Sequence, residues 1–224
     1  TNARDEFIEI YNAGGSAVNL STAGLKLHLW DGSTDTNPAI TFLNTTIPAN
    51  GYFLLATNNY SSTTVGADGI YASTTAIQLV ANGGAYISLS ATAATDVIDK
   101  VGWGTSTVKE GTVFTPSIVV GESIERKASE NATASGMSSS GDYYTSGNAY
   151  DLQNNASDFL AQTPANPQNT SSISEFAFGF SGNEQSGDTI APTVTDSFPN
   201  GSTPMVPVDL QQIGVNFSEA LNSG

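Results

Sequence analysis

The chain contains no cysteine, one histidine and only 6 lysine and arginine residues among its 224 residues. The absence of cysteine excludes disulfide bonds and thiolate chemistry. A single histidine excludes zinc sites built from histidine pairs and leaves no ordinary nucleophile–base triad. The formal net charge of −15 argues against binding to a phosphate backbone, because such binding depends on lysine and arginine. We therefore expect no nucleic-acid partner.

The sequence also lacks an apolar run long enough to cross a bilayer, so no membrane insertion is expected. Only 12% of its residues are charged. The surface must then be covered mainly by serine, threonine, asparagine and glycine, a composition typical of exported and cell-surface proteins. The composition predicts an extracellular or cell-surface location.

Two pairs of nearby acidic residues, Asp96 with Asp99 and Glu6 with Glu9, are candidates for the paired carboxylates of a glycosidase. Both pairs lie in segments with strand-like composition. Residues three apart on a strand point to opposite faces, so neither pair would flank one cleft. The sequence predicts a protein without enzymatic activity.

Short strand-like segments recur along the chain without a helical stretch between them. Leu27 and Leu29 alternate with Lys26, His28 and Trp30, which gives one apolar face and predicts that His28 lies at the surface or at a sheet edge. Strands separated by turns at short intervals indicate an all-β sandwich. The predicted strands are residues 6–11, 25–30, 39–43, 51–56, 77–81, 85–90, 96–103 and 122–127.

Two segments are predicted to be connections. Residues 82–84, Asn-Gly-Gly, suit the turn of a hairpin between neighbouring strands. Residues 128–148 are rich in serine, alanine, glycine and asparagine, with Met137 alone among the larger aliphatic residues. This composition predicts a long surface loop.

The segment DEFIEIYNAGG at residues 5–15 places Ile8 and Ile10 on one face of a strand that runs into an asparagine and glycine turn. Further segments follow in a set order and spacing. Together they resemble the lamin tail domain of secreted bacterial and archaeal proteins, over about residues 1–170. The resemblance implies an immunoglobulin-like β-sandwich. The further segments are residues 19–27, 48–55, 121–127, 155–159 and 163–164.

Members of that family usually begin with an apolar strand a few residues before the segment that matches residues 5–15. Here only residues 1–4 precede it. The resemblance therefore predicts that the first strand is missing from this chain or was never part of it.

Near the other end, residues 188–194, 199–202 and 213–221 resemble the opening of a bacterial Ig-like domain. Such domains need about seven strands, and two or three fit here, so the chain is expected to be a fragment of a longer polypeptide. The predicted organisation is a lamin-tail-like sandwich at 1–170, a linker with a phenylalanine-rich strand at 171–187, and an incomplete Ig-like domain at 188–224.

Phe176, Phe178 and Phe180 recur with the two-residue period of a strand that has one apolar face. Such a strand can add to an exposed sheet edge, which makes these residues candidates for assembly. The alternative is that the segment packs back on its own sandwich and covers an edge there.

Calcium is the favoured metal, because a hard cation prefers carboxylate, amide and carbonyl oxygens. One group of candidate ligands lies within a single segment, and another lies at the entry to the second domain. Neither has the spacing of an EF-hand, and loop aspartates and asparagines also form Asx turns, so both interpretations stay open. The candidates are Asp142, Asp151, Asn154, Asn155 and Asp158 in the first group, and Asp188 and Asp196 in the second.

These features predict a non-enzymatic extracellular structural module, a subunit or repeat of a surface filament, appendage or adhesin. It would associate with itself or with neighbouring Ig-like domains through β-strand addition. The alternative is a carbohydrate or cell-wall binding module of a larger secreted enzyme, with a glycan held by the loops at 58–68 and 128–148. Aromatic rings would then form a stacking platform, although scattered surface aromatics explain them more simply. These aromatic residues are Trp30, Tyr60, Tyr71, Tyr143 and Tyr144.

Overall fold

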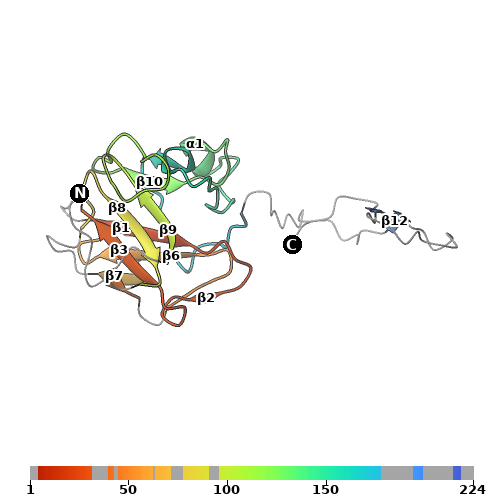
Figure 1. Cartoon of the computed structure of the whole chain (residues 1–224), viewed down its shortest axis with the longest axis horizontal. Coiled ribbons are helices and arrows are strands. Elements are labelled where there is room, and N and C mark those ends of the chain that lie inside the picture. The colour runs from red at the N-terminus through yellow and green to blue at the C-terminus, as the bar shows by residue number, and fades with distance from the viewer. Residues whose placement is uncertain are drawn as a thin grey trace. The chain divides into compact units, whose positions relative to one another are not determined.

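A computed structural model divides the chain into two compact units, Thr1–Phe178 and Gly179–Gly224 (Figure 1). Most of the secondary structure is β-strand, which confirms the all-β prediction. Neither of the described helices is long and apolar enough to cross a membrane. The structure describes residues 5–31, 40–42, 45–62, 64–71, 78–90, 96–177, 194–198 and 214–217.

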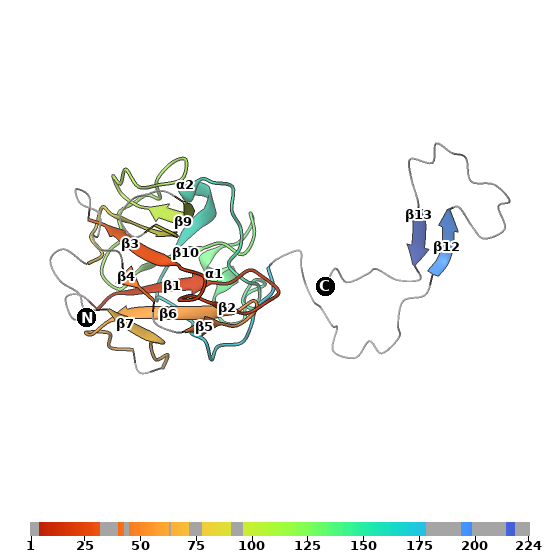
Figure 2. The same ribbon diagram turned by 60° about the horizontal axis from the view of Figure 1, so that its bottom comes forward.

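One main sheet of the first unit has the strand order β1-β6-β7. β1 (Phe7–Tyr11) runs antiparallel to β6 (Tyr52–Thr57), and β7 (Gly69–Tyr71) runs parallel to β6. Every residue of β6 is buried, as expected for a strand with a neighbour on both edges. Figure 2 shows the three strands side by side.

The other main sheet has the strand order β4-β3-β8-β9, and all its neighbours are antiparallel. The pairing of β8 with β9 shifts register between Ile87 and Ser88. The strands are β3 (Lys26–Trp30), β4 (Ile40–Thr41), β8 (Gly84–Ser88) and β9 (Val97–Gly102).

The two sheets share one apolar core. Leu27 and Leu29 of β3 belong to it together with Phe53 and Leu55 of β6. Each fully buried side chain of this size contributes roughly 1.5–3 kcal/mol to stability. The alternation predicted for β1 is confirmed, because its apolar face packs against this core through Ile8 and Ile10.

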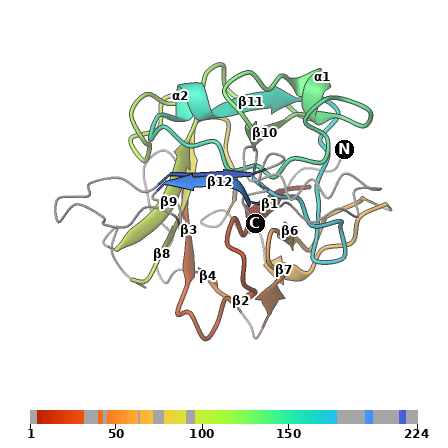
Figure 3. The same cartoon turned by 90° about the vertical axis from the view of Figure 1, so that its right-hand side faces the viewer.

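Shorter elements complete the first unit. β10 and β11 form a separate antiparallel pair, and one-turn helices precede β11 in the chain. Figure 3 shows this pair and both helices together at one end of the unit. The elements are β2 (Val18–Asn19) paired with β5 (Thr46–Ile47), β10 (Ser123–Arg126), α1 (Ala134–Met137), α2 (Asn155–Asp158) and β11 (Phe159–Gln162).

The second unit is described at two strands. β12 (Val194–Phe198) and β13 (Gly214–Phe217) run antiparallel, with an irregularity between Val194 and Asp196. Both strands lie in the range that the sequence assigns to an Ig-like domain.

The strand predicted at residues 77–81 is wrong in the part that the structure describes. Backbone groups of this segment form hydrogen bonds with side chains, where a strand would bond to a neighbouring strand. The Leu79 N–H donates to the Glu6 carboxylate at 3.1 Å, and the Trp103 indole N–H donates to the Val80 carbonyl at 2.7 Å. An apolar run of this kind can therefore join the core without joining a sheet.

Both predicted connections also differ from the structure. Residues 82–84 are not a hairpin turn, because the described residues before β8, 78–83, form no strand and Gly84 already belongs to β8. Residues 128–148 are more than a surface loop, since they include α1 and bury Met137 with Ala128 and Ala132 in a small second core. The sequence did not predict this core, because residues 128–148 contain few large apolar residues.

His28 is fully buried, so its predicted place at the surface or at a sheet edge is wrong. β3 lies inside its sheet, with β4 on one side and β8 on the other. The imidazole stacks on Tyr86 with a centroid distance of 4.3 Å, and its Nε2 lies 2.8 Å from the Ser90 carbonyl oxygen. Both faces of the strand are covered, which local alternation does not reveal.

Candidate functional site

β1 and β10 are two of the outer strands of the first unit, each with an edge that pairs with no other strand in the described part of the chain. β1 is the outer strand of the order β1-β6-β7, and β10 pairs with β11 alone. An unpaired edge presents a row of N–H and C=O groups that another extended chain can bind. Every residue of both strands lines the same groove.

The open edge of β1 is formed by its odd-numbered residues. The Thr57 N–H donates to the Glu6 carbonyl at 3.0 Å, and the Asn12 N–H donates to the Gly51 carbonyl at 2.9 Å. Direct bonds recur at every second residue of an antiparallel pair. Residues 8 and 10 therefore bond to β6, and residues 7, 9 and 11 direct their backbone groups away from it.

The same reasoning places the open edge of β10 at two residues. The Lys127 N–H donates to the Asp158 carbonyl at 2.8 Å, and the register puts Glu125 opposite Leu160. Residues 125 and 123 thus bond to β11. Residues 124 and 126 face away from β11.

The groove has a volume of about 1030 Å³, and most of its lining is apolar. Side chains of the main core, among them Leu27 and Ile87, reach it from the sheet that contains β8 and β9. Three exposed apolar residues also line it: Ile98, Val119 and Val120, which are 58%, 63% and 83% exposed. Exposed apolar surface beside a groove is typical of a binding site.

Two glutamates, Glu9 of β1 and Glu125 of β10, add an acidic part to the groove. Burial raises the pKa of the Glu9 carboxyl to about 8, and it raises that of Glu125 to about 7. Asn148 donates to Oε1 of Glu125 at 3.0 Å, whereas its Oε2 is buried without a hydrogen-bond partner among the described residues. A donor on an incoming chain would find an acceptor here.

Residues 168–175 are tied to the β1-β6-β7 sheet at several points, among them Glu175, which is buried. Its Oε2 accepts from the Tyr52 hydroxyl at 2.6 Å, and its Oε1 accepts from the Gln168 amide at 2.7 Å. Its N–H donates to the Asn50 carbonyl at 2.7 Å, and its carbonyl accepts from the Tyr11 hydroxyl. Burial raises the pKa of Glu175, and both side-chain donors oppose that rise.

Removing one of these donors tests the attachment. We expect Tyr52→Phe to lower stability by about 1–3 kcal/mol, because it leaves a buried carboxylate oxygen without its donor. Hydrogen exchange of residues 168–177 should become faster, while exchange of the β3 amides should change little. Tyr144→Phe removes a hydroxyl from a side chain that is 44% exposed and should change neither quantity. Unchanged exchange in Tyr52→Phe would contradict this role.

A second acidic group lies around Arg126, at the end of β10. Its guanidinium is 2.6 Å from Asp99, 3.5 Å from Asp151 and 4.0 Å from Asp158. Oxygens of Asp99, Glu110 and Asp151 all lie within 4.8 Å of one another. Burial, together with the nearby charges of Asp99 and Asp151, raises the pKa of Glu110 to about 7.

Asn155, the first residue of α2, bonds to the backbone of the two segments that carry Asp99 and Glu110. It is fully buried, and its Oδ1 accepts from the Gly102 and Glu110 N–H groups, both at 2.9 Å. Its Nδ2 donates to the Lys100 carbonyl at 3.1 Å. Asn154 similarly accepts from the Thr112 N–H at 3.2 Å. These two asparagines, predicted as ligands, use their amides to bind backbone.

The aspartates predicted as calcium ligands have different surroundings. Asp151 and Asp158 lie together beside Arg126, and Asp142 is exposed. The Asp158 carboxylate accepts from the Leu152 and Asn154 N–H groups, and the Asp151 carboxylate accepts from the Gln153 N–H two residues on, as in an Asx turn. Asp188 lies outside the described residues. Asp196 lies in β12 of the second unit. Calcium binding by this set stays a prediction.

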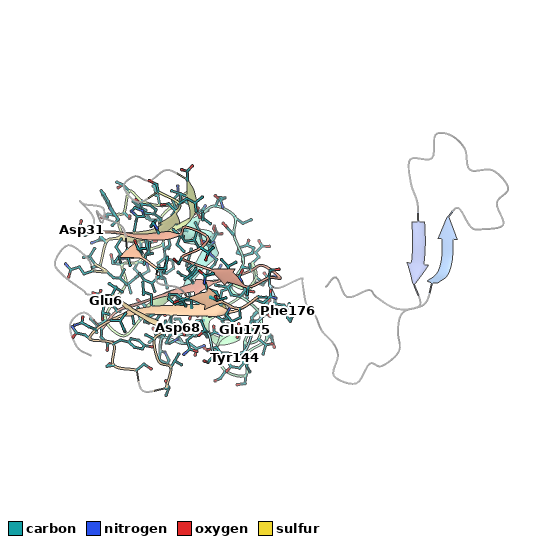
Figure 4. All side chains as sticks on the ribbon, turned by 90° about the horizontal axis from the view of Figure 1, so that it is seen from below. Glu6, Asp31, Asp68, Tyr144, Glu175 and Phe176 are labelled. Carbon is teal, nitrogen blue, oxygen red and sulfur yellow. The ribbon has the colours of Figure 1, made fainter. Side chains whose placement is uncertain are left out.

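The residues predicted for assembly and for glycan binding are also only partly described. Phe176 is 46% exposed, and it lies near Glu175 and Tyr144 in Figure 4. Its carbonyl accepts from the Gly147 N–H at 2.8 Å. Phe178 and Phe180 lie outside the described residues. Among the proposed sugar-stacking residues, Tyr71 is not at the surface, because it is buried and bonded to Glu6. Trp30, Tyr60 and Tyr143 are partly buried.

Sequence reasoning missed the groove itself and the role of Glu110. The open edges of β1 and β10 depend on which strands pair, and pairing joins residues far apart in the chain. Glu110 stands in a polar segment with no acidic neighbour closer than Asp99, so nothing local marked it. The sequence offered one local indication: in a strand with alternating side chains, Asp99 points to the opposite face from Ile98.

No protein-family model matches this chain, and no curated protein matches it. The resemblance to the lamin tail domain therefore rests on the quoted segments alone.

Proposed function

We propose that the first unit is an immunoglobulin-like sandwich of the lamin-tail type, which acts outside the cell as a non-enzymatic structural module. It assembles into a surface filament, appendage or adhesin by accepting an extended strand into the groove between β1 and β10. The observation that carries this proposal is that the open edges of both strands line one groove of about 1030 Å³. A single inserted strand would bond to both edges and join the β6-β1 and β10-β11 pairs into one sheet.

The chemistry of the groove defines the strand that fits it. The apolar lining calls for apolar side chains at every second residue on one face of the strand. Residues 176–180 have this pattern, with Phe176, Phe178 and Phe180 separated by alanine and glycine. Five extended residues span about 17 Å, the length of β1. We therefore take the occupant to be this segment of a second copy of the chain, in which Phe176 and Ala177 give up their pairing with Gly147 of their own first unit.

Light scattering of the purified chain tests the proposal. We expect a mass that rises with concentration above the 23.1 kDa of one chain. A variant with Phe178→Asp and Phe180→Asp should stay monomeric, because charged side chains would have to enter an apolar groove. Asp188→Asn with Asp196→Asn changes the charge elsewhere and should still assemble. A monomer at all concentrations contradicts the proposal, and assembly by the phenylalanine variant contradicts this occupant.

A peptide experiment tests the groove independently of the whole chain. A labelled peptide of residues 172–182 should bind the phenylalanine variant, whose own groove is intact. A peptide with Phe178 and Phe180 replaced by serine should bind at least tenfold more weakly, because each lost phenylalanine removes apolar burial. Equal binding of both peptides would exclude recognition through the apolar face. A glycan array on the same variant tests the carbohydrate alternative.

A further inference from the structure

The three-carboxylate cluster of Asp99, Glu110 and Asp151 comes from three separate places in the chain. Asp99 lies on β9, Glu110 in the loop after β9, and Asp151 in the segment before α2. Oxygens of the three side chains lie within 4.8 Å of one another. Ligands on opposite sides of a calcium ion, each 2.3–2.6 Å from it, lie about 4.6–5.2 Å apart. One ion can therefore contact all three side chains.

Acidic side chains gather on protein surfaces without binding metal, so the buried member of this cluster is decisive. Glu110 is 7% exposed, and its Oε2 has no hydrogen-bond partner among the described residues. A buried carboxylate oxygen without a partner is costly, because burial removes it from water and nothing replaces the lost bonds. The side chain nevertheless points at two other carboxylates. A cation between them would supply the missing interaction.

Arg126 supplies part of the positive charge but does not complete the cluster. It bonds to Asp99 at 2.6 Å and approaches Asp151 at 3.5 Å, and no ion pair joins it to Glu110 in the described part of the chain. The four nearby carboxylates, with Asp158 included, outnumber Arg126 and the neighbouring Lys100. Asp151 also accepts from Gln153, whose backbone N–H donates to Oδ1 at 2.8 Å and whose side-chain amide donates to Oδ2 at 3.0 Å. An ionised carboxylate has about four lone-pair sites, so these bonds and those with Arg126 still leave sites for a metal.

We propose that Asp99, Glu110 and Asp151 form a site for a divalent cation, with calcium as the preferred ion. Three carboxylates and water match the flexible oxygen shell of calcium, whereas magnesium requires a near-ideal octahedron of short bonds. The site differs from the one predicted from sequence, which it shares only at Asp151. It ties β9 to the loop before α2 and does not depend on strand insertion.

Equilibrium dialysis with calcium and calorimetry of the full chain test the site. We expect saturable binding of one ion at this cluster, with a Kd on the order of 10⁻⁴–10⁻³ M, as in extracellular calcium modules. Thermal unfolding followed by tryptophan fluorescence should shift up by roughly 3–6 °C at about 10 mM calcium. Magnesium at equal concentration should give a smaller shift. All samples are matched in ionic strength, because the chain is strongly acidic.

Two variants connect the binding to these side chains. Glu110→Gln keeps the shape of the buried side chain, and Asp151→Asn changes an exposed residue and keeps an oxygen that can accept from the Gln153 N–H. We expect each to weaken calcium binding at least tenfold and to abolish most of the thermal shift. Asp142→Asn removes the same charge from an exposed residue outside the cluster and should bind like the original chain.

Two results would overturn the site. One is the absence of saturable calcium binding below about 10 mM. The other is binding by Asp151→Asn that equals binding by Asp142→Asn, since calcium would then be held by the acidic surface in general. Because Asp151→Asn does not touch the core, the test stays decisive even if Glu110→Gln fails to fold.

Discussion

Replacing Asn155 by alanine should lower the free energy of unfolding by about 3–5 kcal/mol. The side chain is fully buried and forms three hydrogen bonds with backbone. Alanine would leave the Gly102 and Glu110 N–H groups and the Lys100 carbonyl without these bonds. Each such group costs roughly 1–3 kcal/mol when it stays buried and unpaired.

Urea denaturation followed by tryptophan fluorescence measures this effect cleanly. Both tryptophans of the chain, Trp30 and Trp103, lie in the first unit, so the signal reports on that unit alone. Asn131→Ala is the matched control, because Asn131 is exposed and should change stability by less than about 0.5 kcal/mol. If both variants unfold at the same urea concentration, Asn155 does not connect β9 to the loop that carries Glu110.

Replacing Glu9 by glutamine should make the first unit more stable at alkaline pH but not at acidic pH. Burial, together with the nearby charges of Glu125 and Glu175, raises the pKa of Glu9 from an ordinary 4.5 to about 8. The N–H of Gln168 opposes the rise by donating to the carboxylate. The buried carboxyl is thus favoured in its protonated form.

The direction of the pH dependence follows from proton binding. Between about pH 4.5 and pH 8 the folded chain holds a proton at Glu9 that the unfolded chain has lost. Stability from this group is therefore fully present below pH 4.5 and falls as the pH rises through 8. The loss is on the order of 3–5 kcal/mol at high pH. Glutamine stays neutral at every pH, so the Glu9→Gln variant does not lose this stability at high pH.

Unfolding free energies of the original chain and of Glu9→Gln, measured in urea from pH 5 to pH 9, test this prediction. The difference between the two proteins should be small at pH 5 and should grow steadily toward pH 9. Glu130→Gln makes the same chemical change at an exposed residue, and its difference from the original chain should not depend on pH. A constant difference for Glu9→Gln would show that its carboxyl is ionised in the folded state throughout this range. Glu125, whose pKa is raised to about 7, should behave similarly in a smaller window.

These two residues belong to one arrangement. Asn155 positions the loop beside the three-carboxylate cluster, and Glu9 lies on the β1 edge of the groove. Both are polar side chains in buried surroundings, where the loss of a hydrogen-bond or charge partner has a large effect on stability. An inserted strand would change the surroundings of Glu9 directly. A bound cation would change those of Glu110.

The all-β class and most of the strands of the first unit could be predicted from local patterns in the sequence. Side-chain direction in a strand alternates with period two, so Ile8 and Ile10 on β1 and Leu27 and Leu29 on β3 identify their own buried faces. This information is local and needs no knowledge of neighbouring strands. The resemblance to the lamin tail domain adds an expected fold and function that stay proposals.

Which surfaces are open and which polar side chains meet depends on tertiary contacts. His28 obeys the local alternation and is still buried, because Tyr86 stacks on its ring and Ser88 and Ser90 contact its Nε2. Asp99, Glu110 and Asp151 are separated by up to 52 positions and meet through the pairing of strands and the packing of α2. The groove likewise lies where β1 and β10 each have an edge without a partner strand among the described residues. These features depend on pairing between residues far apart in the chain. A periodic pattern along one segment does not reveal such pairing.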